Sequence, residues 1–120
     1  MRDRVLTGVA VTGFAFGTAT HAWDFLRFGW WPYRYGPVGL TLFSNALVLL
    51  DAVVVVLLLT RRRVGLSVGI AVMMLDVVAN SYAWRVLGYD GFDIAVPIQA
   101  AFLIFLLIAW PALAGRHCRV

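Results

Sequence analysis

Four long apolar runs dominate this sequence and constrain its fold more than any other feature. An α-helix needs about 20 residues to cross the hydrocarbon core of a bilayer, and each run is long enough to do so once. The connecting segments are short, and a helix satisfies all its backbone hydrogen bonds within one segment. The sequence therefore predicts one all-α domain over residues 1–120, a four-helix transmembrane bundle with up-down-up-down topology. The predicted spans are residues 5–26, 38–60, 64–84 and 94–114.

The polar content is too low for a water-soluble protein of this length. Charged residues make up only 13% of the 120 residues, whereas soluble domains average roughly 25%. The sequence contains no lysine, so it has no side chain for Schiff-base chemistry. One cysteine cannot form an internal disulfide, and two scattered histidines give no metal-ligand pattern. We therefore expect neither a metal nor a cofactor, and no separate catalytic domain fits beside four spans.

The arginines are distributed unequally between the two ends of the predicted helices. Three of them (Arg27, Arg34 and Arg85) flank one end, and seven flank the end that holds both termini. The positive-inside rule therefore places both termini in the cytoplasm. Such a basic face attracts anionic lipid headgroups, so the expected partner is the lipid bilayer and not nucleic acid. The seven arginines are Arg2, Arg4, Arg61, Arg62, Arg63, Arg116 and Arg119.

With four short spans and no soluble domain, the chain resembles the many small four-span membrane proteins of bacteria. That resemblance implies a multi-pass protein of the bacterial cytoplasmic membrane. The sequence carries no family motif that would add a substrate or an activity. Residues 1–22 also have the charged start and apolar stretch of a signal peptide. Cleavage there would remove His21 and leave three spans, and this alternative stays open.

Two carboxyl groups fall near the centres of the predicted spans, where an ionisable residue indicates function by default. At about 1.5 Å of rise per residue, Asp51 and Asp76 both lie within roughly 3 Å of the membrane midplane. The three-arginine turn makes their helices antiparallel neighbours, so the two side chains are expected to form an acid–base pair. A low dielectric disfavours the charged form, which suits proton exchange.

A second layer of polar residues lies closer to the outer end of the spans. His21 would exchange protons near neutral pH and is predicted to act with the two aspartates as a catalytic residue. Three amides, Asn45, Asn80 and Gln99, are predicted to orient the polar end of a ligand. Further out, Asp24, Trp23 and Trp84 are candidate ligand-binding residues. The tryptophans are more typical of an interfacial aromatic belt, and the amides of hydrogen bonds that join helices.

Glycines spaced by four residues occur on the first and third spans. Gly13 and Gly17 share a face with His21, and Gly65 and Gly69 share a face with Asp76. Such spacing permits close approach of two helix backbones. Where the glycines stop, the helices are expected to separate and to leave a cavity biased towards the outer side.

These features leave three functions open. The first is binding of a small hydrophobic or amphipathic molecule, or acid–base chemistry on it, by Asp51, Asp76 and His21. The second is proton-coupled transport or a proton path, which calls for a homodimer because four short helices enclose a narrow pore. The third is an accessory or assembly subunit whose polar residues only hold helices in register. The sequence names no substrate and does not decide whether the protein is an enzyme.

Overall fold

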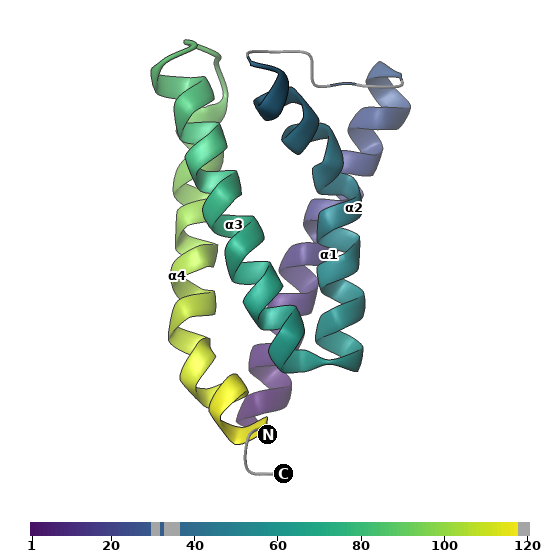
Figure 1. The fold of residues 1–120 in the computed structure, drawn as a ribbon, viewed down its shortest axis with the longest axis vertical. Coiled ribbons are helices and arrows are strands. Elements are labelled where there is room, and N and C mark those ends of the chain that lie inside the picture. The colour runs from purple at the N-terminus through teal and green to yellow at the C-terminus, as the bar shows by residue number, and fades with distance from the viewer. Residues whose placement is uncertain (30–31, 33–36, 118–120) are drawn as a thin grey trace.

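A computed structural model of the chain describes residues 1–29, 32 and 37–117. Four α-helices run side by side in this part of the chain, and no strand occurs in it (Figure 1). The start of α1, the junction of α2 with α3 and the end of α4 lie at one end of the bundle (Figure 1). The helices are α1 (Arg2–Phe28), α2 (Val38–Thr60), α3 (Arg62–Arg85) and α4 (Phe92–His117).

Each predicted span is a helix, and each is long and apolar enough to cross a membrane. The bounds of α2 are those predicted from hydropathy. The other three helices extend a few residues further, because helix formation does not stop where the apolar run stops. The longest dimension of the molecule is 45 Å, which matches the thickness of about 40–45 Å of a bilayer with its headgroups.

Short connections bring sequential helices together. Arg61 alone separates α2 from α3, and its backbone N–H donates to the carbonyl of Leu57 at 2.6 Å. The connection from α3 to α4 contains Gly88 and Gly91 with φ angles of 76° and 93°. Only glycine adopts this region readily, so these two residues allow the chain to reverse over a few positions. As a result α1 packs on α2, α2 on α3 and α3 on α4, whereas α1 and α4 touch less.

Most buried apolar side chains lie in the half of the bundle nearest the α2–α3 junction. All four helices contribute to this cluster, and nearly all of its members lie between that junction and the level of Asp51 and Asp76. The bundle is therefore filled by hydrocarbon on one side of the two aspartates. Representative members of this apolar core are Ala10, Phe14, Val54, Leu58, Leu66, Val72, Leu106 and Leu113.

The distribution of polarity is the reverse of that in a water-soluble protein. Large aliphatic side chains cover the outside of the bundle, whereas Asp51 and Asp76 are each only 5% exposed. Lipid tails solvate such an exterior without penalty, so the pattern is that expected of a bundle surrounded by lipid. Examples of these outward residues, between 67% and 73% exposed, are Leu49, Leu59, Val78 and Ile108.

The glycines of α3 lie at close helix contacts, as their spacing predicts. A Cβ atom on Gly65 would stand 2.5 Å from the backbone nitrogen of Leu58 in α2. One on Gly69 would stand 2.9 Å from the ring of Phe14 in α1. The absence of a side chain lets α3 approach α2 closely at Gly65, and at Gly69 it leaves room for the Phe14 ring.

Arg34, Arg119 and the single cysteine, Cys118, lie outside the described part of the chain.

Candidate functional site

A cavity of about 580 Å³ lies between α1 and α4, which touch less than the sequential helix pairs do. We call it the central cavity. Aromatic and aliphatic side chains form most of its wall, including Phe14 and Phe16 from α1 and Ile98 and Phe102 from α4. Its polar lining consists of Thr20, His21, Asp51, Asp76 and Gln99, so all four helices place polar atoms in one space.

His21 of α1 and Asp51 of α2 face each other where these two helices pack together. The Nε2 atom of His21 lies 3.8 Å from Oδ2 of Asp51. This separation is within the range of an ion pair but longer than a direct hydrogen bond. The side chains of His21 and Asp51 are 20% and 7% exposed. Both side chains line the central cavity, so a molecule bound there would lie beside both polar groups.

Asp76 belongs to a second polar group, which joins α3 to α4. The amide nitrogen of Asn80, one turn further along α3, donates to Oδ1 of Asp76 at 2.9 Å. The same nitrogen donates to Oε1 of Gln99 in α4 at 2.8 Å. Asn80 thus holds the carboxyl group and the glutamine in fixed positions beside the cavity.

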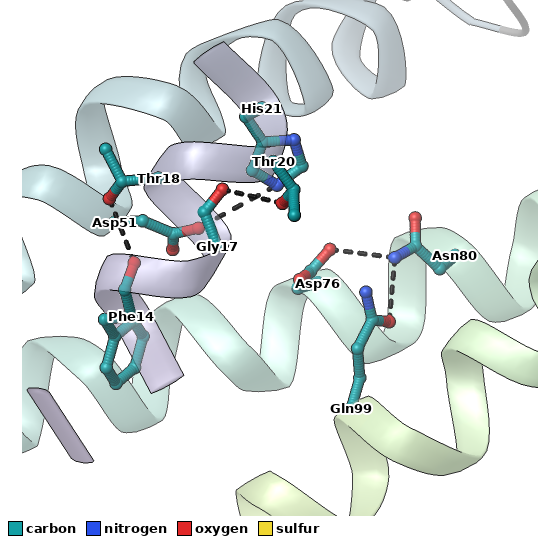
Figure 2. A network of polar contacts seen from close by, with 9 residues as sticks. All are labelled: Phe14, Gly17, Thr18, Thr20, His21, Asp51, Asp76, Asn80 and Gln99. Atoms are coloured by element: carbon teal, nitrogen blue, oxygen red, sulfur yellow. Dashed lines mark hydrogen bonds and ion pairs between the residues drawn. The ribbon is translucent and has the colours of Figure 1, made fainter. Parts of the chain in front are cut away.

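The two aspartates line the same cavity, yet each has its own partner. Figure 2 shows Asp51 beside His21, and Asp76 with Asn80 and Gln99. Within the described residues, no hydrogen bond joins the two carboxyl groups. The arrangement is therefore two polar groups on either side of a shared space, and not one carboxyl dimer that ties α2 to α3.

A smaller cavity of about 370 Å³ adjoins the central one, since both are lined by His21, Ala95 and Gln99. Ser44 of α2 and Asn80 of α3 add polar groups to it. Tyr89 and Asp90, from the α3–α4 connection, also line it. Polar groups therefore continue from the two aspartates towards the end of the bundle that holds this connection.

Gly13 and Gly17 are part of the cavity wall, whereas the sequence predicted that the cavity would begin only beyond them. A Cβ atom on Gly17 would stand 2.5 Å from Oδ2 of Asp51, and one on Gly13 would overlap the ring of Phe102. The Phe102 ring packs edge-on against Phe14 with centroids 5.3 Å apart. The two glycines therefore make room for the groups that define the cavity, a carboxyl group and an aromatic ring.

The structure brings together five of the nine predicted site residues. His21, Asp51, Asp76 and Gln99 line the central cavity, and Asn80 is bonded to two of them. The other four line neither cavity: Asn45, Asp24, Trp23 and Trp84.

Those four residues have other surroundings. Asn45 is buried and donates from Nδ2 to the carbonyl of Thr41 in its own helix at 2.8 Å. Trp23 is 59% exposed on the outside of α1. The guanidinium of Arg85 lies over the ring of Trp84, 4.6 Å from the ring centroid. Asp24 is half-buried one turn beyond the cavity.

Sequence reasoning missed several lining residues, above all Phe102, Ser44 and Tyr89. Phe102 is one of many apolar residues in its span, and nothing in its local sequence distinguishes a residue that faces a cavity from one that faces lipid. Ser44 shares a helix face with Asn45, and that shared face is the signal that could have identified it.

No group of three or more metal-ligand side chains occurs among the described residues. Comparisons with known proteins add no relative: no protein-family model, no curated protein and no solved structure matches the chain. The case for a function therefore depends on the geometry alone.

Proposed function

We propose that this chain is a multi-pass membrane protein that binds a small amphipathic molecule in its central cavity. The proposed topology is up-down-up-down with both termini in the cytoplasm, so that the cavity lies towards the outer side. One observation carries the proposal: three ionisable side chains, His21, Asp51 and Asp76, line the same cavity as a wall of aromatic and aliphatic side chains. Ionisable side chains inside a bilayer are costly and therefore rare, and those that occur usually mark functional sites.

The size and lining of the cavity support a ligand with one polar end. Its volume of about 580 Å³ falls within the roughly 300–1,000 Å³ typical of small-molecule sites. The His21–Asp51 contact and the Asp76–Asn80–Gln99 group offer donors and acceptors on two sides of a polar headgroup. Phe14, Phe102 and Ile98 would pack against an apolar body. The same groups would support acid–base chemistry on the bound molecule.

A proton path through the whole bundle is the weaker candidate. Beyond Asp51 and Asp76, towards the α2–α3 junction, the interior consists of the apolar core that includes Val54, Leu66 and Leu106. Protons need polar side chains or water to move, and the side chains of this core are apolar. Proton flux into vesicles that contain the protein would distinguish the two functions, because a binding site alone gives no flux above that of protein-free vesicles.

The direct test is to purify the protein from a membrane and identify co-purified small molecules by mass spectrometry. The variant is Asp76→Asn, which keeps the shape of the side chain and the acceptor for Asn80. Its matched control is Asp93→Asn, the same chemical change at an exposed position in the first turn of α4. We expect the amount of bound molecule per protein to fall about tenfold in the variant, since hydrogen bonds to charged groups contribute about 1.5–3 kcal/mol.

The control variant should retain the wild-type amount of bound molecule. If no molecule co-purifies with the wild-type protein, the central cavity is not a binding site. The same conclusion follows if Asp76→Asn and Asp93→Asn retain equal amounts of the molecule. An accessory role would be favoured instead if Asp51→Asn and Asp76→Asn leave every measured property unchanged.

A further inference from the structure

A separate pocket lies at the opposite end of the bundle from the central cavity. Its volume is about 620 Å³, and residues from α1, α2 and the start of α3 line it. Arginines from two helices face it, Arg4 from α1 and Arg62 from α3. We call it the arginine pocket. It is distant from Asp51 and Asp76 and has no part in the proposed ligand site.

Two buried polar atoms of this pocket have no partner. Thr7 Oγ1 and Arg62 Nε are both buried, and neither makes a hydrogen bond within the described part of the chain. Buried polar groups are normally paired, and leaving one unpaired costs about 1–3 kcal/mol. The other end of the Arg62 guanidinium, Nη2, donates to the carbonyl of Leu113 at 3.5 Å, so the side chain is held in place.

The charge at the pocket is also uncompensated. The described residues supply no ion pair to Arg4 or Arg62, whereas nearby Arg2 lies 3.8 Å from Asp3. The guanidinium of Arg62, the more exposed guanidinium of Arg4 and a hydroxyl form a donor set that suits the oxygens of a phosphate.

The remaining wall of the pocket is hydrocarbon. Val11 and Leu58 lie deeper in the spans than Arg4, and Leu59 is 68% exposed on the outside of the bundle. The lining therefore changes from cationic at the end of the bundle to apolar further in. An anionic phospholipid has the same gradient, with a phosphate at the membrane surface and acyl chains below it.

We propose that the arginine pocket binds the phosphate group of an anionic phospholipid, with its acyl chains against Val11 and Leu59. Arg4 and Arg62 donate to the phosphate oxygens, and the Thr7 hydroxyl donates to the same group. The proposal requires the chain to lie in a bilayer, but it does not depend on the function of the central cavity. The chemistry recognised is a phosphate, and a lipid headgroup is the source to which the apolar wall points.

The test measures thermal stabilisation of the full chain in a neutral detergent on titration with a phospholipid. Three probes are compared: phosphatidylglycerol, phosphatidylcholine with the same acyl chains, and inorganic phosphate. We expect phosphatidylglycerol to raise the Tm in a saturable manner and the other two to have little effect. Stabilisation by inorganic phosphate at the same concentration as the lipid would overturn the lipid as the source.

The variants distinguish specific binding in the arginine pocket from general attraction of anionic lipid to a basic surface. Arg4→Gln and Arg62→Gln should each weaken the apparent lipid affinity at least about tenfold, as expected for lost charge-assisted hydrogen bonds. The matched control is Arg61→Gln, at an exposed arginine of the same turn that does not line the pocket. Its effect should be at most about fivefold, the size of one surface charge near anionic lipid. Equal losses in all three variants would overturn the pocket.

Thr7→Val gives a second readout that does not depend on charge. Valine has the shape of threonine without the hydroxyl, so it removes one unpaired buried group. The lipid-free variant should therefore be at least as stable as the wild type, while its Tm shift at a fixed, subsaturating lipid concentration should be smaller. An unchanged shift would show that the hydroxyl does not contact the lipid and would overturn its assigned role.

Discussion

The imidazole of His21 lies 3.8 Å from the carboxyl group of Asp51, close enough to attract it and too far to hydrogen-bond to it directly. This spacing differs from that of Asp76, which receives a direct bond of 2.9 Å from Asn80. One aspartate is therefore held by its neighbours, and the other has an incomplete set of partners. The difference gives the two carboxyl groups different roles, which substitutions can separate.

His21→Gln should affect binding more than stability. Because the His21–Asp51 contact is longer than a direct hydrogen bond and glutamine keeps a side-chain donor and acceptor, the free energy of unfolding should change by less than about 1 kcal/mol. The amount of co-purified ligand should fall about tenfold, since a polar contact to the ligand is lost. Unfolding in mixed micelles and mass spectrometry of the purified protein measure the two quantities. A large loss of stability with unchanged binding would assign His21 a purely structural role.

Asn80 and Gln99 should show a measurable coupling energy, because their hydrogen bond of 2.8 Å joins α3 to α4. A double-mutant cycle with Asn80→Ala and Gln99→Ala should give about 0.6 kcal/mol and no more than about 1.7 kcal/mol, the range measured for such bonds in membranes. Asn45 supplies the control, since its amide bonds to Thr41 within its own helix. A cycle between Asn45→Ala and Gln99→Ala should give no coupling, and equal couplings would contradict the structure.

Gly65→Ala should destabilise the bundle by about 1–3 kcal/mol, the usual cost of overpacking. The new methyl group would stand 2.5 Å from the backbone nitrogen of Leu58, and backbone cannot move aside as a side chain can. Gly39→Ala in α2 is the matched control, because nothing lies within 4 Å of its Cβ position. Its free energy of unfolding should be unchanged or slightly higher. The close contact of α2 with α3 is wrong if both variants behave alike.

Ala95→Phe should block the central cavity without changing any polar residue. Ala95 lines both cavities, so a phenyl ring there occupies ligand space. Ala101→Phe, on an exposed part of the same helix, is the control for added bulk. We expect the first variant to lose the co-purified molecule and the second to retain it. Retention by both variants would place the ligand elsewhere.

Cysteine labelling tests the proposed topology. Cys118 is the single cysteine, so a membrane-impermeant maleimide should label the native protein only from the cytoplasmic side. In a Cys118→Ser background, Asp93→Cys should be labelled only from the outer side, because Asp93 lies near the start of α4 and Cys118 follows its end. Labelling of both positions from the same side would exclude the proposed fourth crossing.

Hydropathy was sufficient to predict the four helices. Each spanning helix needs about 20 apolar residues, and this requirement applies to each segment separately. The buried positions of Asp51 and Asp76 could also be predicted, since helical periodicity places them on the faces that carry Asn45 and Asn80. The same argument identified Gly65 and Gly69 as contact residues. Each of these predictions depends on depth and face within one helix.

The partners of the polar residues could not be predicted in this way. Asn45 and Gln99 were predicted at similar depths, yet Asn45 bonds to its own helix, whereas Gln99 reaches Asn80 across to α3. Trp23 lies near the same level as the site but faces outward. Rotation and tilt of one helix against another decide such outcomes, and a single sequence contains no direct measure of either.

The sequence alone determined that the chain forms four membrane-length helices and that two of them, α2 and α3, carry an acidic group near the centre, because both properties follow from the local sequence. Only the tertiary structure decided that Asp51 pairs with His21 while Asp76 pairs with Asn80, and that Phe102 packs over Gly13. These contacts depend on how the bundle separates between α1 and α4, and that separation is set by packing among all four helices at once.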